Sequence, residues 1–196
     1  AVGAAALAAN TTATGGVGIG YRALNVNTTG ANNTAVGYDS LLSNTTGAGS
    51  VAIGAHALDA STTGDDNVAV GMHALGSNTT ASDNTAVGRS TLANTTTGAN
   101  NVAIGRSALA LNTTASNNTA VGKDALGVNT TGEANTALGS LALDANTTGG
   151  FNTGLGVHAL GANTTASYNT AVGWGSLKVN TTAANNTAVG HFALGA

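Results

Sequence analysis

The sequence predicts an all-β fold, a parallel β-solenoid of about eleven coils with 17 residues in each coil. The main observation is a glycine that recurs every 17 residues without an insertion, from Gly3 to Gly190. A leucine follows each of these glycines four residues later. An unbroken period of this length indicates units that bury their apolar side by stacking on their neighbours. We therefore treat residues 1–196 as a single repeat domain and as a fragment of a longer fibre protein.

The repeat unit reads Asn-Thr-Ala-Val-Gly-x-x-Ala-Leu-x-x-Asn-Thr-Thr-Gly-x-x. Segments such as Thr34-Ala35-Val36 and Val51-Ala52-Ile53 alternate β-branched residues with a small one, which predicts a short strand that ends at the glycine. A second short segment surrounds the Ala-Leu pair, and Asn-Thr-Thr-Gly has the composition of a turn. Two or three short strands should close each coil, and the stacked coils should form a rod of roughly 50 Å.

Three repeated columns are expected to fill the interior of the rod. They are the leucine after each glycine, the Val, Ile or Leu directly before it, and the Thr or Val two places earlier. The leucines predicted to be in the core are Leu24, Leu41, Leu58, Leu75, Leu92, Leu109, Leu126, Leu143, Leu160 and Leu177.

The alanine between the two strand columns is expected to face outward by strand alternation. An apolar stripe of small residues on the outside of a rod is either harmless exposed alanine or a face against which another chain packs. We favour an interchain face, because thin coils with little core gain stability from oligomerisation. Its residues are Ala35, Ala52, Ala69, Ala86, Ala103, Ala120, Ala137, Ala171 and Ala188.

The composition argues against several functional classes. Only 7% of the residues are charged and the net charge is −3, so no cationic stripe is available for nucleic acid or an anionic membrane. No apolar segment is long enough to span a membrane. The chain has no cysteine, which excludes disulfides and thiolate metal sites.

No catalytic or metal-binding set emerges from the repeat. The sequence has no Gly-x-Ser-x-Gly motif and no Asp-x-Asp-x-Asp-Gly loop. His56 and His73 share a column and should stack about 4.8 Å apart, but two histidines make a poor metal site. We expect no enzyme, no cofactor and no metal.

The charged and aromatic residues all fall in the variable columns, as expected for a scaffold with fixed inner and drifting outer positions. Single exposed aromatic residues need no functional explanation. Tyr168, Trp174 and Phe192 nevertheless gather in the last third of the chain. This is the one region where we expect contact with a ligand.

The Asn-Thr-Thr triplets permit three interpretations. Stacked Asn and Thr side chains can hydrogen-bond from coil to coil, and each triplet is also an N-x-Thr glycosylation acceptor. Outward threonine rows resemble those of ice-binding proteins, although adjacent threonines cannot both face outward on a flat strand. The acceptor asparagines are Asn27, Asn44, Asn78, Asn112, Asn129, Asn146, Asn163 and Asn180.

The strand-and-glycine units at 50–54, 101–105 and 118–122 resemble the head repeats of YadA-like trimeric autotransporter adhesins. The full unit at 118–132 is similar to the tandem repeats of phage tail-fibre proteins. This resemblance covers the whole chain. It implies a homotrimer of left-handed parallel β-rolls around a threefold axis, outside the cell on a bacterial surface or on a phage or phage-like particle.

The expected function is that of a structural and adhesive fibre segment, whose partners are copies of itself and a cell-surface or glycan receptor. Two alternatives remain open. One is a monomeric ice-binding β-solenoid that uses the Thr-Thr column, and the other is a subunit of a self-assembling extracellular filament.

Overall fold

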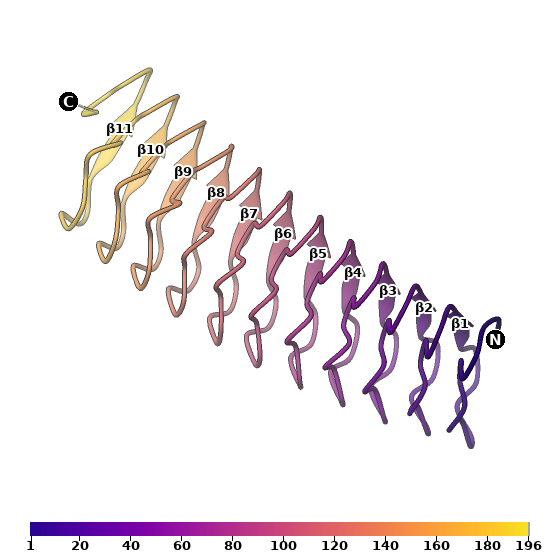
Figure 1. Cartoon of the computed structure of the whole chain (residues 1–196). Coiled ribbons are helices and arrows are strands. Elements are labelled where there is room, and N and C mark those ends of the chain that lie inside the picture. Colours follow the sequence, from indigo (N-terminus) through magenta and orange to yellow (C-terminus); the bar gives the residue numbers. More distant parts are fainter. Residues whose placement is uncertain (196) are drawn as a thin grey trace.

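The computed structural model describes residues 1–195, which form a single row of stacked coils with the two termini at opposite ends (Figure 1). In this part of the chain eleven three-residue strands make one parallel sheet, in which the strand order follows the sequence. Every strand residue pairs with the residue 17 positions along, as in Thr119↔Thr136. The predicted parallel β-solenoid with a 17-residue period is therefore confirmed. The strands are β1 (Val17–Ile19), β2 (Thr34–Val36), β3 (Val51–Ile53), β4 (Val68–Val70), β5 (Thr85–Val87), β6 (Val102–Ile104), β7 (Thr119–Val121), β8 (Thr136–Leu138), β9 (Thr153–Leu155), β10 (Thr170–Val172) and β11 (Thr187–Val189).

Each of these coils contains one strand instead of the two or three expected. The Ala-Leu segment is a turn, because the residue two places after the glycine and the leucine both have left-handed backbone, as at Arg22 (φ 51°) and Leu24 (φ 53°). Left-handed positions break an extended strand. Hydrogen bonds between coils continue through the turn, for example from the Leu41 N–H to the Ala57 carbonyl at 3.0 Å.

The leucine column forms the core, as predicted. The side chains of nine leucines are fully buried and that of Leu177 is 4% exposed. They pack with an alanine that precedes them in most coils, such as Ala125 before Leu126. The leucines confirmed in the core are Leu24, Leu41, Leu58, Leu75, Leu92, Leu109, Leu126, Leu143, Leu160 and Leu177.

The strand alanines also lie inside, so the prediction that they form an outward interchain face is wrong. Their methyl groups face the leucines: a methyl group placed on Gly154, which replaces alanine in β9, would lie 3.4 Å from a Leu143 methyl carbon. Only a small side chain fits between a strand and the opposing leucine column. The buried alanines are Ala35, Ala52, Ala69, Ala86, Ala103, Ala120, Ala137, Ala171 and Ala188, of which only Ala188 has measurable exposure, at 5%.

The two columns that flank the alanine point outward for the same reason. In β2 the side chains of Thr34 and Val36 are both partly exposed, whereas Ala35 is buried between them. The same pattern holds in all eleven described strands. The prediction that these Thr, Val, Ile and Leu residues belong to the core is therefore wrong.

The repeated glycine is required by both its conformation and its space. Gly122 has φ +135°, and a Cβ at this position would lie 2.6 Å from the backbone carbonyl of Gly139 in the next coil. A left-handed φ of this size is accessible almost only to glycine. The glycine thus lets the chain turn away from the strand while neighbouring coils stay in contact.

A ladder of buried asparagines supports the turn on the other side of each coil. In this first Asn ladder, Asn146 Nδ2 donates to Asn129 Oδ1 at 2.9 Å in the preceding coil and to the carbonyl of Gly149 at 2.9 Å. A second Asn ladder, which includes Asn118 and Asn135, links coils through side-chain oxygens that accept from backbone N–H groups. Each ladder satisfies backbone groups that would otherwise be buried without a partner.

These contacts contradict the interpretation of the triplets as glycosylation acceptors. Seven of the eight named asparagines have a side chain at most 1% exposed, and an Nδ2 atom that donates a buried hydrogen bond is unavailable for modification in the folded chain. The asparagines concerned are Asn27, Asn44, Asn78, Asn112, Asn129, Asn146 and Asn163. Asn180 is partly exposed, and its Nδ2 donates to Asn163 Oδ1 and to the Ala183 carbonyl.

Candidate functional site

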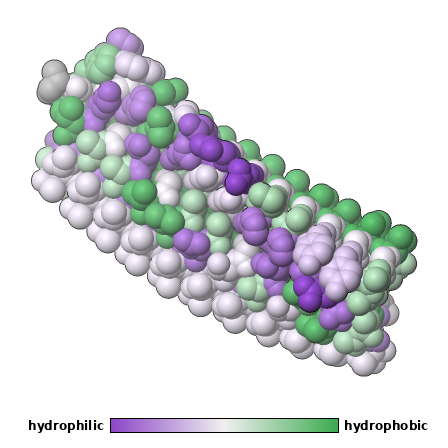
Figure 2. Space-filling view, viewed as in Figure 1, coloured by the Kyte–Doolittle hydropathy of each residue, from purple (hydrophilic) through white to green (hydrophobic). Residues whose placement is uncertain are grey.

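The most extensive candidate surface is the outer side of the sheet. We define the sheet face as the first and third residues of β1–β11, which point outward in two parallel columns. The third residue is always Val, Ile or Leu, and Ile53, Ile104 and Leu138 are each 41% exposed. Figure 2 shows hydrophobic residues along one long edge of the rod, the edge where Figure 1 places the strands.

The chemistry of the sheet face is uniform along the rod. Its 22 residues are seven threonines and fifteen Val, Ile or Leu residues, with no charged side chain. An uncharged apolar strip of this length is larger than the scattered apolar residues of an ordinary surface. A stable protein interface commonly involves about 20–30 residues on each side, so the sheet face has the size of a complete interface.

The structure divides the two threonines of each Asn-Thr-Thr triplet between different tasks. The hydroxyl of the first threonine donates to the carbonyl of its counterpart in the next coil, as from Thr130 to Thr147 at 3.0 Å. The second threonine, such as Thr131, is exposed. The triplets thus present one free threonine row along the rod, consistent with the expectation that both cannot face outward.

The aromatic and histidine side chains form short surface stacks. His56 and His73 stack with ring centroids 5.1 Å apart, close to the predicted spacing, and Tyr21 stacks on Tyr38 at 5.3 Å. His56 Nδ1 lies 3.3 Å from an Asp59 carboxylate oxygen. Within residues 1–195, no group of three or more His, Cys, Asp or Glu side chains is arranged to hold a metal ion.

The three aromatic residues expected to form one ligand region belong to two separate stacks. Trp174 contacts the rings of His191 and Phe192, with centroids 5.2 and 4.4 Å away, and the Lys178 amine lies over its indole. Tyr168 instead stacks on Phe151.

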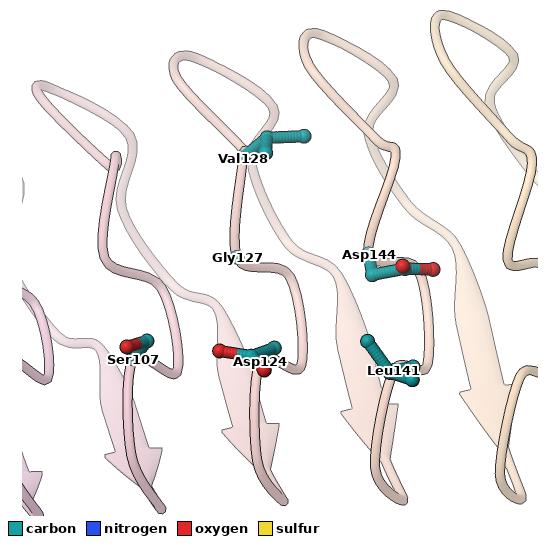
Figure 3. Close-up of a pocket in the computed structure, with 6 residues that line it drawn as sticks. All are labelled: Ser107, Asp124, Gly127, Val128, Leu141 and Asp144. Atoms are coloured by element: carbon teal, nitrogen blue, oxygen red, sulfur yellow. The ribbon is translucent and has the colours of Figure 1, made fainter.

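A shallow hollow of about 230 Å³ lies on another side of the coils, lined by Ser107, Asp124, Gly127, Val128, Leu141 and Asp144 (Figure 3). Gly127 leaves the space because it has no side chain. Burial raises the pKa of the Asp144 carboxyl group, while Asp124 is paired with Lys123 at 3.4 Å and with Arg106 at 3.5 Å. The hollow contains no pairing of a nucleophile with a base, so its geometry does not suggest catalysis.

One ion pair links the first coils more tightly. Arg22 Nε donates to Asp39 Oδ1 at 2.8 Å, and a second guanidinium nitrogen bonds the other carboxylate oxygen. This hydrogen bonding raises the pKa of Arg22. Because Asp39 is only 3% exposed, the pair acts as a fastening between neighbouring coils.

Comparison with known protein families, curated proteins and solved structures found no match to this chain. No helix among the described residues has the length and hydrophobicity needed to cross a membrane. The sheet face is the functional surface that sequence reasoning missed. Its signal was the same alternation of Thr-Ala-Val, assigned to the opposite sides of the strand.

Proposed function

We propose that the chain is a structural segment of an extracellular attachment fibre, in which three copies pack their sheet faces around a common axis. The proposal combines the sequence resemblance to adhesin and tail-fibre repeats with the exposed apolar strip. The left-handed coil and the location on a bacterial surface or phage-like particle are parts of the same proposal. In this arrangement the segment holds a receptor-binding element at a distance from its base.

The continuous, uncharged sheet face is the observation that carries the proposal. Its Val, Ile and Leu column runs from β1 to β11 without a charged or strongly polar substitution. Burying such a column between chains removes apolar area from water, at roughly 25 cal/mol for each Å². By contrast, the charged residues occupy other columns, where they would stay in solvent.

The repeated register also suits association between identical rods. Because neighbouring strands advance by about 4.8 Å and every coil presents the same two residue types, side chains of parallel copies can meet at each level. The small variation among Val, Ile and Leu would then fix the axial alignment of the chains. The interchain face in this proposal is the pair of columns beside the alanines.

A second candidate is ice binding by a monomer. The exposed row of second threonines, which includes Thr114 and Thr131, supports it because their hydroxyl groups are regularly spaced. This row is a single column, and the first threonine hydroxyls are already bonded to backbone carbonyls. The sheet face is the larger regular surface, so we favour the fibre.

The mass of the protein in solution tests the proposal. A trimer of 18.6 kDa chains has a mass of about 56 kDa by light scattering after size exclusion. Val121→Arg would place one charge from each chain at the centre of the interface and should yield monomers. Thr131→Arg, on the exposed turn of the same coil, is the matched control and should remain trimeric.

The alternatives give different results in the same experiment. A wild-type monomer would refute the trimer, and thermal hysteresis of that monomer would identify ice binding instead. Polymers whose mass grows with concentration would identify the filament. A Val121→Arg variant that stays trimeric, with an unchanged circular dichroism spectrum, would show that the sheet face is not the interface.

A further inference from the structure

An aromatic pair, Phe151 and Tyr168, occupies the turns that precede β9 and β10. The two rings stack with centroids 5.1 Å apart and an interplanar angle of 5°. They are 56% and 59% exposed, more than the rings of Tyr21, Tyr38, Trp174 and Phe192. The pair is therefore a rigid, ordered apolar feature that is presented to solvent.

The backbone at these two positions is unfavourable for large residues. Phe151 has φ 59° and Tyr168 has φ 62°, both in the left-handed region. This region favours Gly, Asn and Asp, and those residues fill the column in the eight other coils between Asn32 and Asn185, apart from Ala134. Two adjacent aromatic residues thus replace residues that suit the turn better, which points to a role for the rings themselves.

The column leaves room beside the Phe151 ring. One coil before Phe151 the same position is Ala134, and one coil before that it is Asn117. Two coil steps of about 4.8 Å separate Asn117 from Phe151, and the only side chain between them in the column is a methyl group. The face of Phe151 that is remote from Tyr168 therefore borders a slot of the thickness of one stacked ring.

Polar groups lie next to this slot. Glu133 directly precedes Ala134 and is exposed, and its backbone carbonyl accepts the Phe151 N–H at 2.9 Å. The Asn117 side chain is also exposed at the far end of the slot. The slot thus combines an aromatic face with a carboxylate and an amide.

We infer that the slot between Phe151 and Asn117 binds one pyranose ring of a carbohydrate. A pyranose with several C–H bonds on one face can lie against the negative face of an aromatic ring. Its hydroxyl groups then reach hydrogen-bonding groups at the rim, here Glu133 and Asn117. Galactose matches best, because its axial O4 leaves adjacent C–H bonds together on one face. This site is independent of the interface between chains proposed above.

The probe for the test is methyl β-D-galactopyranoside, added to the intact protein while the Phe151 and Tyr168 ring signals are followed by NMR. A ligand of this size held by a single open subsite should bind with a Kd of about 1 mM. Saturable shifts of these ring signals are the expected result. Their absence at roughly tenfold higher sugar concentration would overturn the inference.

Two variants separate sugar binding from folding. Phe151→Asn removes the aromatic face while restoring a residue natural to this column, so the melting temperature should not fall but the Kd should rise roughly tenfold or more. Ala134→Tyr fills the slot with a ring in the conformation that Tyr168 already adopts, and it should also abolish binding. The titration of Ala134→Tyr follows the Tyr168 signal.

Tyr38→Ser is the matched control, because it removes an exposed aromatic ring from another stack and should leave the Kd unchanged. Equal affinity of Phe151→Asn and the wild type would refute the site, as would equal loss of affinity in Tyr38→Ser. Loss of the trimer in Val121→Arg with retained sugar binding would show that the two proposals stand separately.

Discussion

Ser61 interrupts the first Asn ladder, and replacing it with asparagine should stabilise the rod. At this break the Oδ1 atom of Asn44 and the Oγ atom of Ser61 are both buried without a hydrogen-bond partner. In the uninterrupted part of the ladder, Asn163 Nδ2 donates to Asn146 Oδ1 at 2.9 Å and to the Ala166 carbonyl at 3.0 Å. Ser61→Asn would supply the equivalent donor to Asn44 and would remove the unpaired hydroxyl group.

The expected gain follows from the two unsatisfied atoms. Each buried polar atom without a partner costs about 1–2 kcal/mol at the conservative end of the usual range. Immobilising the longer asparagine side chain opposes the gain by about 1 kcal/mol. The free energy of unfolding should therefore rise by about 1–3 kcal/mol, which corresponds to an increase in Tm of about 2–12 °C for a chain of this length.

Thr95→Asn is the matched control, because Thr95 also interrupts the ladder but its hydroxyl group has partners. Thr95 Oγ1 donates to the Asn112 carbonyl and accepts from Asn112 Nδ2, both at 3.3 Å. Its replacement should change the free energy of unfolding by less than about 0.5 kcal/mol, as expected where no unsatisfied group is relieved. Urea and thermal unfolding followed by circular dichroism measure both variants. A Ser61→Asn variant no more stable than Thr95→Asn would refute the reasoning.

Two further predictions concern single positions in the eighth and ninth coils. Gly154→Ala should stabilise the chain by about 0.5–1 kcal/mol, because alanine fits this place in other coils. Gly156→Ala should destabilise it by at least about 2 kcal/mol, since its φ is +132° and a Cβ would lie 2.6 Å from the Gly173 carbonyl oxygen; similar denaturation midpoints of the two variants would contradict both statements. Burial raises the pKa of Asp144 above 3.8, so the folded state binds this proton more tightly than the unfolded state does, and the resulting stabilisation is lost as the pH rises through the raised pKa. Asp144→Asn should therefore gain stability relative to the wild type as the pH rises from 4 towards neutrality, and a pH-independent difference in urea midpoints would argue against this assignment.

The period and the leucine column were sufficient to predict the solenoid. Seventeen-residue spacing required stacked coils, and Leu126 and its counterparts are apolar in every coil, so their burial followed directly. The strand position was also predictable, because Thr119, Ala120 and Val121 alternate in size before a glycine. In these features one residue type at one position permits only one structural interpretation.

The orientation of the strand was not predictable from alternation alone. Period two places Ala120 opposite to Thr119 and Val121, but it does not say which side is inside. Hydrophobicity favoured valine inside, whereas the narrow space opposite the leucines admits only a methyl group. The candidate interface consequently moved from the alanines to the columns beside them.

The aromatic pair was hidden for a different reason. Tyr168 was noted with Trp174 and Phe192 because they are close in sequence, but contacts in a solenoid follow the 17-residue interval. Phe151 lies one interval before Tyr168, so comparison at this spacing would have found the pair. The left-handed conformation of both residues could be inferred only from the Gly, Asn and Asp residues in the same column.

The order of the strands along the sheet has a mechanical consequence. Each coil is bonded only to the coil before it and the coil after it, so tension along the rod loads the connections in series and peels the chain from an end. A released coil of 17 residues extends to roughly 55–60 Å, compared with a rise of about 4.8 Å when it is folded. A single chain under load would thus lengthen in equal steps of about 50–55 Å, each of which dissipates work before the attachment itself is strained.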